Sequence, residues 1–323
     1  MKIGSLHSLG RYDCLFVSPH PGDVTLSCMG RMLWERNRGL RALVLVVFAG
    51  NESKEDSDLL DRFGFDEMRL DVPAAPRRQE LYTSFDAVLH GRHPGDERQL
   101  ATLRESVEAV ILQTQARHVY LPLGVGGHVD HRLVHEAGAQ AMPDAPGREI
   151  FFYEERPYAF LPGAVWIRLG QLGARLPPAA HLSEATGLVQ YLLRFQMASY
   201  VRAHARTVGE RARCSRAALK QWMEARGWHP RRACGPRFQP VEHPLDAPAL
   251  EVARELLQHH AADLTLCTAA PRPRPARPAV VPRLKRRDEI ERYWLLLPPL
   301  EGEMAILPGG LGLADSERSA GVA

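Results

Sequence analysis

Three apolar runs in the first half of the chain constrain its fold more than any other feature. They are 14-CLFV-17, 42-ALVLVVFAG-50 and 118-HVYLPLG-124. Their apolar residues are continuous rather than alternating, which is typical of parallel strands whose two faces are both covered by helices. The sequence therefore predicts an α/β domain with a buried sheet.

The segments between and after these runs have helical periodicity. Residues 24–39 carry apolar residues three and four positions apart and end at Gly39, which suits a helix C-cap. Residues 97–115 and 130–142 are predicted to be helices, and residues 149–155 a further strand. Because strands and helices alternate, we expect a mostly parallel sheet with right-handed crossovers and helices on both faces.

The pattern becomes mainly helical in the second half of the chain. Helices are predicted over 183–205, 215–227 and 248–264, and a packed strand over 292–298. The stretch 271-PRPRPARP-278 is incompatible with a helix or a central strand, so it is predicted to be a surface connector.

Composition excludes several classes of protein. Of the 323 residues, 45% are hydrophobic and 24% charged, as in soluble globular proteins. The net charge of +3 comes without a basic stripe interleaved with aromatic residues, so no nucleic-acid partner is expected. No apolar run reaches the roughly 18 residues that span a bilayer, and no signal peptide is visible. Five scattered cysteines do not suggest a disulfide framework. We expect a cytoplasmic protein without a membrane partner, and the sequence leaves homo-oligomerisation open.

Two loops at predicted carboxyl ends of strands carry clustered polar residues. In open α/β sheets, sites lie at this edge of the sheet. The loops are 18-SPHPGDVTLSC-28 and 126-GGHVDHR-132, and their polar residues are His20, Asp23, His128, Asp130 and His131.

Three of these side chains match the ligand set of a catalytic zinc ion. Such an ion takes imidazole nitrogens and carboxylate oxygens from three residues and keeps one position open. His20, Asp23 and His131 supply that number. Either loop alone is a weak signal, because an HxxD spacing is common and Asp130 also suits a helix N-cap. Together, at the ends of two strands of one sheet, they indicate a site for zinc or another divalent ion.

His128 and Asp130 are expected to lie beside the metal. Alternate residues of an extended loop face the same side, so the Asp130 carboxylate is predicted to accept the Nδ1–H of His128. Such a pair fixes the imidazole tautomer and raises its basicity. A histidine held in this way can donate or accept a proton during hydrolysis.

The two loops resemble the signature of the PIG-L/LmbE family of zinc-dependent N-deacetylases, which has an HPDD-type loop after its first strand and an HxDH loop further on. The resemblance is carried by 18-SPHPGDVTLSC-28, 48-FAG-50, 121-LPLGVGGHVDHRLVHEAG-138 and 152-FYEERPYA-159, and it covers about residues 12–160. It implies a Rossmann-like sheet, a zinc or similar divalent ion, and hydrolysis of an N-acyl group, often on an amino sugar.

The resemblance also implies a role for each polar residue of the two loops. By motif position, His20, Asp23 and His131 are the metal ligands. His128 is the proton-donating or oxyanion-stabilising histidine, and Asp130 orients it.

Gly22 is the main departure from the family pattern. The family has an Asp at this position, understood to be the general base, and its loss costs about 10²–10⁴ in rate. The His128–Asp130 pair is the favoured substitute, with a carboxylate of the acidic segment as another; the acidic candidates are Glu52, Glu55 and Asp56. The alternatives are a catalytically impaired homologue that acts as a metal- or sugar-binding module, or a different metal-assisted reaction.

The residues expected to contact substrate are also altered. Ala74 stands where the family's substrate-binding acid is expected, and Arg77 or Arg78 matches the arginine that follows. Arg156 and Tyr158 follow a predicted strand at the same sheet edge and are expected to line the pocket. The predicted substrate is a small molecule, an N-acetylated amino sugar or a conjugate of one.

We therefore divide the chain into five parts. These are a metal-binding α/β core (1–165), a helical extension packed on the core (166–265), a Pro-rich connector (266–282), a strand segment that returns to the core (283–308) and a flexible tail (309–323).

Other enzyme and binding classes fit the sequence less well. A nucleotide-binding Rossmann or flavodoxin-like domain has the same strand pattern, but the first loop has no GxGxxG and too few glycine amides for a pyrophosphate. A serine hydrolase is not expected, because Ser18 and Ser27 have no base at a suitable spacing.

Overall fold

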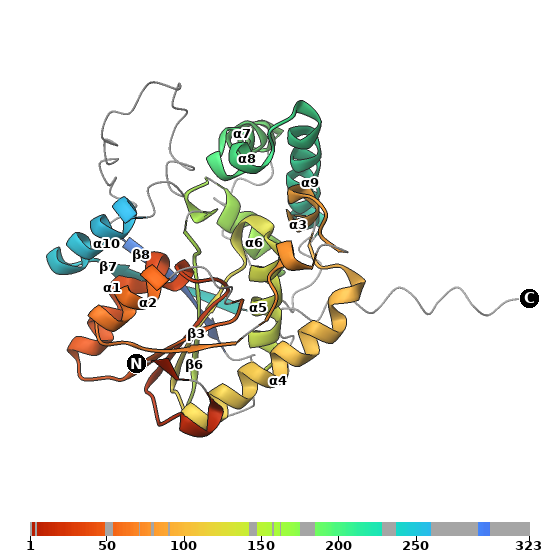
Figure 1. The fold of residues 1–323 in the computed structure, drawn as a ribbon. Helices are drawn as coiled ribbons and strands as arrows, with labels where there is room; N and C mark the ends of the chain where they lie inside the picture. Colours follow the sequence, from red (N-terminus) through yellow and green to blue (C-terminus); the bar gives the residue numbers. More distant parts are fainter. Residues whose placement is uncertain are drawn as a thin grey trace, which may run out of the picture.

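A mostly parallel sheet with helices on both faces forms the centre of the molecule (Figure 1). The computed structural model describes residues 2–3, 5–48, 54–70, 72–78, 81–89, 91–141, 147–156, 158–161, 163–174, 185–227, 237–259 and 290–297.

The strands of the described residues join one sheet in the order β1-β4-β3-β2-β5-β6-β8-β7. They are β1 (Lys2–Ile3), β2 (Cys14–Ser18), β3 (Ala42–Val46), β4 (Asp66–Arg69), β5 (His118–Pro122), β6 (Glu149–Tyr153), β7 (Arg237–Pro244) and β8 (Ile290–Leu297).

The helices lie between and after these strands. They are α1 (Asp23–Asn37), α2 (Lys54–Arg62), α3 (Phe85–Leu89), α4 (Glu97–Thr114), α5 (Val129–Gln140), α6 (Ala164–Gln171), α7 (Ala185–Met197), α8 (Ser199–His204), α9 (Val208–Gly227) and α10 (Ala247–His259). Short 3-10 turns that matter below are η2 (Ala75–Arg77), η4 (Val125–Gly127) and η5 (Tyr158–Phe160).

The strand order creates a switch point between β2 and β5. From β2 the chain builds outward through β3 and β4, then returns to place β5 and β6 on the other side of β2. All pairings from β1 to β6 are parallel, whereas β8 runs antiparallel to β6 and β7 antiparallel to β8. The predicted Rossmann-like, mostly parallel sheet is therefore confirmed. Ligands of such sheets bind at the carboxyl ends of the two strands that flank the switch point.

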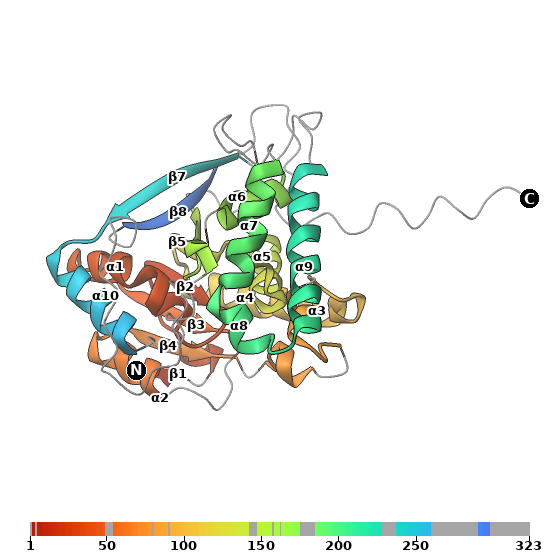
Figure 2. The ribbon, with the colours of Figure 1, turned by 90° about the horizontal axis from the view of Figure 1, so that it is seen from above.

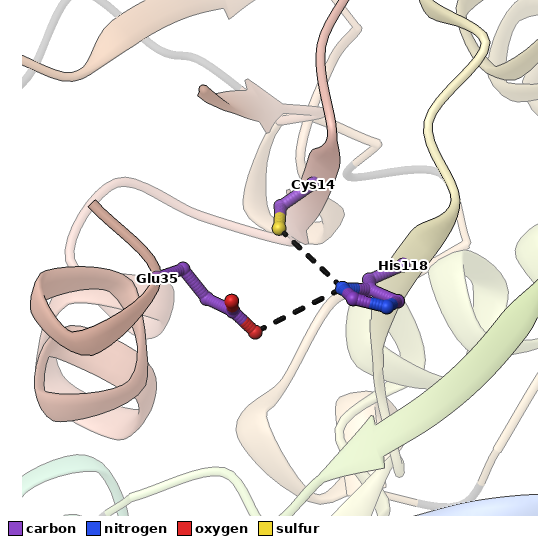
Figure 3. Close-up of side chains that lie close together, drawn as sticks. All are labelled: Cys14, Glu35 and His118. Atoms are coloured by element: carbon purple, nitrogen blue, oxygen red, sulfur yellow. Dashed lines mark hydrogen bonds and ion pairs between the residues drawn. The ribbon is translucent and has the colours of Figure 1, made fainter. Parts of the chain in front are cut away.

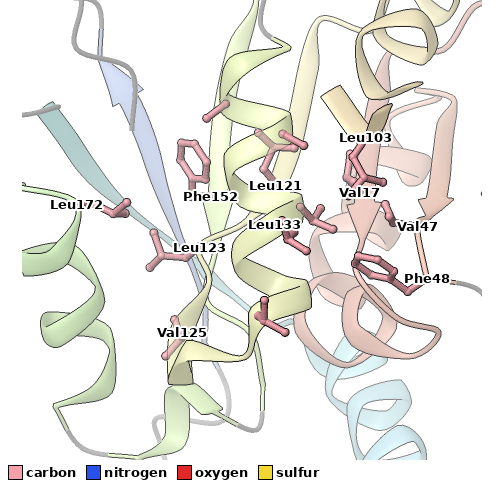
Figure 4. Close-up of a cluster of buried hydrophobic side chains, with 14 of the residues drawn as sticks. Val17, Val47, Phe48, Leu103, Leu121, Leu123, Val125, Leu133, Phe152 and Leu172 are labelled. Carbon is pink, nitrogen blue, oxygen red and sulfur yellow. The ribbon is translucent and has the colours of Figure 1, made fainter. Parts of the chain in front are cut away.

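Each face of the sheet has its own hydrophobic core, because successive strand side chains point to opposite faces. Leu15 and Val17 of β2 belong to the core that α4 and α5 cover, which includes Leu103 and Leu133 (Figure 4). Phe16 belongs to the other core, which α1, α2 and α10 cover. Continuous apolar strands thus arise because both faces are buried, as predicted from the sequence.

The second half of the chain packs in two separate places. Helices α6, α7 and α9 pack together beside α3, while α10 lies against α1 at the other side of the sheet (Figure 2). The helix predicted over 183–205 is two helices, because Ala198 between them has an extended backbone (φ −58°, ψ 134°).

Strand β7 was not predicted: residues 166–265 were expected to form a helical extension, and no strand was expected between its helices. Its sequence, RFQPVEHP, contains two prolines and several polar residues, so it has little strand propensity of its own. It forms by pairing along its whole length with β8, from Arg237 opposite Leu297 to Pro244 opposite Ile290. Whether these residues form a strand thus depends on a partner far away in the sequence, which local periodicity does not reveal.

Several predicted segments lie outside the described residues. The connector (266–282) and the tail (309–323) do so entirely, and of the segment 283–308 only β8 is described. Among the described residues, no helix is both long and apolar enough to cross a membrane. The cytoplasmic location stays a prediction.

Candidate metal centre

The first loop connects β2 to α1 at the switch point. Gly22 caps α1 with a left-handed backbone (φ 91°, ψ −27°), a conformation that glycine adopts most easily. The hydroxyl of Ser18 donates to the carbonyl oxygen of His20 at 2.6 Å and accepts from the amide of Val24 at 3.2 Å. The tight turn brings Asp23 back toward His20, whose amide donates to Asp23 Oδ2 at 2.8 Å.

The second loop connects β5 to α5 through the glycine-rich turn η4. Gly126 and Gly127 both have φ of 81°. A Cβ on Gly127 would lie 2.1 Å from Nε2 of Gln221 in α9, and one on Gly126 would lie 2.7 Å from the ring of Tyr158. Glycine therefore allows η5 and α9 to approach the loop closely.

His20, Asp23 and His131 converge where the two loops meet. One ligand atom from each lies within 4.8 Å of the others. Oδ2 of Asp23 lies 3.3 Å from Nε2 of His131 and 3.3 Å from Nδ1 of His20. The structure thus brings together the three residues predicted to bind the metal.

The electrostatics of this cluster fit a divalent cation. Burial opposes a charge on His20, but hydrogen bonds to Asp130 and Asp23 outweigh it and raise the pKa of His20 to about 10. Burial likewise opposes ionisation of Asp23, yet His131 and His20 lower the pKa of its carboxyl. The two carboxylates beside the His20 imidazole, buried Asp130 and partly exposed Asp23, favour a positive charge at this position. Zinc or a similar ion would supply that charge, held by two imidazole nitrogens and one carboxylate oxygen.

The predicted hydrogen bond from His128 to the Asp130 carboxylate is wrong. His128 is the N-cap of α5, and its Nδ1 accepts a hydrogen bond from the backbone amide of Asp130 at 3.2 Å. Asp130 lies in the first helical turn rather than in an extended loop, so alternation of side chains does not apply to it. Its carboxylate accepts instead from Nε2 of His20 at 2.9 Å and from the amide of Ala75 at 2.9 Å.

This geometry determines the chemical character of His128. Because Nδ1 is an acceptor, the proton of the neutral ring is on Nε2. Burial lowers the pKa of His128 to about 3, and the favourable charge of Asp130 does not compensate. His128 is therefore a neutral N–H donor beside the candidate ligands, with its ring 5.3 Å from that of His131.

Glu155 is a site residue that the sequence analysis did not identify. Its side chain is fully buried, and its Oε1 lies 3.4 Å from Nδ1 of His131. The same carboxylate accepts from the amides of Gly124 and Val125 in the second loop. A carboxylate behind a metal-binding histidine sets the orientation of its ring. Its position just beyond the carboxyl end of β6, at the same sheet edge, is the signal that could have identified it.

The four residues predicted to bind substrate lie in different surroundings. Arg78 is largely buried, and its Nη2 donates to Oδ1 of Asp130 at 2.9 Å, so it supports the cluster from behind. Tyr158 places its ring edge-on to His131, at 5.3 Å between centroids. Arg77 is exposed. The guanidinium of Arg156 donates to the carbonyl oxygen of Ile290, which ties this arginine to β8.

The acidic candidates for a general base lie outside the described side chains. Glu52 is outside the described residues, and the side chains of Glu55 and Asp56 are outside them as well, although both residues belong to α2.

Known proteins resemble this chain in sequence. The family model described as PIG-L, GlcNAc-PI de-N-acetylase, matches residues 15–142. The chain is 32% identical over 206 residues to 2'-N-acetylparomamine deacetylase of Streptomyces fradiae. This match covers 58% of this chain and 72% of the relative. It is 26% identical over 191 residues to 2'-N-acetylparomamine deacetylase of Niallia circulans. This second match covers 45% of this chain and 66% of the relative.

Solved structures show the same fold. The zinc inhibited form of teicoplanin deacetylase Orf2 has a TM-score of 0.53 at 14% identity, over 88% of this chain and 97% of that one. The A40926 pseudoaglycone deacetylase Dbv21 has a TM-score of 0.50 at 15% identity, over 89% of this chain and 98% of that one. The matched family region contains both loops of the cluster, and the Streptomyces fradiae relative is covered over most of its length. This chain belongs to the PIG-L family of deacetylases.

Proposed function

We propose that this protein is a metal-dependent hydrolase that removes the N-acetyl group of an amino sugar carried by a small molecule or conjugate. The observation that carries the proposal is the convergence of His20, Asp23 and His131 beside the neutral donor His128. The two sequence relatives support the reaction class, because both are named as deacetylases of 2'-N-acetylparomamine. A substrate related to that amino sugar is the first choice.

In this proposal His20, Asp23 and His131 hold zinc or another divalent ion. When bound, such an ion polarises the acetamide carbonyl and makes water a stronger nucleophile at neutral pH. Glu155 and Asp130 orient the two histidine rings, through Nδ1 of His131 and Nε2 of His20. A defined ring orientation matters because metal affinity depends on where the lone pairs point.

His128 stabilises the negative charge that develops on the acetamide oxygen. Its Nε2 carries the proton, since Nδ1 accepts from the amide of Asp130. Its lowered pKa keeps the ring neutral, so it acts as a fixed hydrogen-bond donor. Of the two roles that the family resemblance allowed, this arrangement favours oxyanion stabilisation over proton transfer.

The mechanism also requires a group that accepts a proton from the attacking water. Gly22 has no side chain to offer, and His128 is a poor base because both ring nitrogens are already committed. The favoured substitute, a His128–Asp130 base, therefore loses its support. The acidic residues that follow β3 in the sequence become the leading candidates; they are Glu52, Glu55 and Asp56.

The lack of a side chain at Gly22 also favours a second candidate function. If none of those carboxylates reaches the cluster, the protein binds a metal and a sugar without efficient turnover. The fold and the metal ligands would then be retained while the step that Gly22 no longer assists is lost.

Amine release from N-acetylated amino sugars distinguishes the two candidates. The zinc-loaded full chain is incubated with 2'-N-acetylparomamine and N-acetylglucosamine, and free amine is measured for the wild type and for Gly22→Asp. Wild-type turnover that His20→Ala abolishes supports the hydrolase. Turnover only in Gly22→Asp supports the binding module. Failure of the loaded wild type to hold a metal ion contradicts both candidates.

A further inference from the structure

A second cluster of metal-ligand side chains lies at the opposite edge of the sheet. Cys14 and His118 are the first residues of β2 and β5, and they are direct neighbours in the register of these two strands. Glu35, near the end of α1, points its carboxylate toward both (Figure 3). The metal-centre residues follow the other ends of the same strands.

The three side chains are close enough to share an ion. Sγ of Cys14 and Oε1 of Glu35 each lie 3.8 Å from Nδ1 of His118. Zinc bonds of about 2.0–2.3 Å place two ligands of a tetrahedral ion about 3.5 Å apart. Small side-chain rotations would therefore complete coordination by the three residues. A fourth coordination position would face solvent beside His118, which is partly exposed.

Glu35 is buried with one oxygen unsatisfied. Its side chain is fully buried, and Oε1 accepts from Tyr120 at 3.1 Å and pairs with Arg31 at 2.7 Å. Oε2 is also buried and has no hydrogen-bond partner among the described residues. An unsatisfied buried carboxylate oxygen is costly. A cation bound by both oxygens of the carboxylate would satisfy it.

The orientation of His118 also suits a ligand. Its Nε2 lies 3.1 Å from Oε2 of Glu149, which leaves Nδ1 facing Cys14 and Glu35. A carboxylate on the far nitrogen of a metal-binding histidine is a common arrangement, because it fixes the ring and raises its basicity.

We propose that Cys14, Glu35 and His118 bind a thiophilic divalent cation, with zinc as the first choice. Thiolate and imidazole ligands select zinc over magnesium or calcium. The ion takes the place of the thiol proton of Cys14, which is released to solvent. It ties β2, β5 and α1 together and shares no ligand with the His20 cluster, so the proposal does not depend on deacetylation.

The competing explanation is a structural network without an ion. In that network Arg31 alone neutralises Glu35, and the Cys14 thiol donates to His118. It accounts for Oε1 of Glu35 but leaves Oε2 without a partner. An ion held by both oxygens of the Glu35 carboxylate accounts for Oε2 and for the approach of Cys14.

Cobalt(II) titration of the full chain tests the proposal, because a thiolate–cobalt bond gives a charge-transfer absorption in the near ultraviolet. The His20 cluster has no sulfur ligand and gives no such band. We expect the band in the wild type, in His20→Ala and in Cys28→Ser, a matched control for a fully buried thiol. We expect Cys14→Ser to lose it. Absence of the band in the wild type, or its persistence in Cys14→Ser, overturns the proposal.

Two further variants keep the test decisive if Cys14→Ser does not fold. Glu149→Gln keeps all three ligands and should weaken cobalt binding roughly 10-fold, the lower range for loss of a supporting carboxylate. His118→Gln removes a ligand and should weaken it by more than roughly 100-fold. For both variants the affinity is read from the near-ultraviolet band, which the His20 cluster does not give, and an unchanged value in His118→Gln overturns the proposal.

Discussion

Nε2 of His20 lies 2.9 Å from Oδ2 of Asp130, although 110 positions separate the two residues in the chain. The contact links the loop after β2 to the first turn of α5. It indicates that Asp130 supports His20, a proposed metal ligand, rather than His128. Arg78 and the amide of Ala75 hold the same carboxylate.

The contact predicts that Asp130→Asn weakens metal binding. The amide keeps the shape of the side chain but loses the charge that orients and polarises His20. We expect zinc affinity to fall about 10–100-fold, as for other carboxylates behind metal-binding histidines. Competition with a chromogenic chelator measures it. Asp58→Asn, at an exposed position of α2, is the control and should leave affinity unchanged. Equal affinity in both variants would contradict the assignment.

Gly22→Asp is predicted to restore a general base at a cost in stability. We expect deacetylation to rise by about 10²–10⁴ if no other base operates. A side chain at φ 91° should destabilise the fold by about 1–2 kcal/mol, measured by urea unfolding. Gly39→Asp is a matched control, because Gly39 also has a left-handed backbone (φ 79°) and no atom within 4 Å of an added Cβ. It should show the stability loss without the gain in rate.

Arg78→Ala and Arg77→Ala should differ sharply. Arg78 pairs with the buried carboxylate of Asp130 and lies 3.4 Å from Oδ1 of Asp96, so its loss removes a positive charge beside two buried carboxylates. We expect the free energy of unfolding to fall by about 3–5 kcal/mol. Arg77 is exposed, and its loss should change stability by about 0.5 kcal/mol or less. Similar urea midpoints for the two variants would show that the Arg78–Asp130 pair contributes little.

Glu291 predicts a pH dependence of stability. Burial raises the pKa of this carboxyl above its ordinary value of 4.5, although Arg156, Tyr293 and the amides of Gly30 and Arg31 favour the charged form. The folded protein thus favours the protonated form more than the unfolded chain does, and this stabilising contribution is lost as the pH rises through the folded pKa. Relative to the wild type, Glu291→Gln should become progressively more stable above about pH 4.5. Urea unfolding of both proteins across this range measures it, and a constant difference would contradict the raised pKa.

The central strands and the longest helices of the first half of the chain could be predicted because their signals are local, whereas α2, β4 and α3 were not predicted. The runs that start at Cys14, Ala42 and His118 are continuous and apolar, and each proves to be a central parallel strand. Strand β7 could not be predicted, because it depends on pairing with β8, which lies about fifty residues further along the chain.

The sequence by itself determined which residue types gather at the switch point. His20, Asp23, His128, Asp130 and His131 follow two strands whose apolar character forces them side by side in one buried sheet. Only the tertiary structure decided which of these side chains touch. A left-handed Gly22 and an N-cap at His128 set the directions of the side chains that follow, and η5 and α9 pack against the glycines of the second loop. The periodicity of apolar residues indicates which face of a helix or strand is buried. The hydrogen-bond partner of a buried carboxylate such as Asp130 or Glu155 instead comes from a segment distant in the sequence.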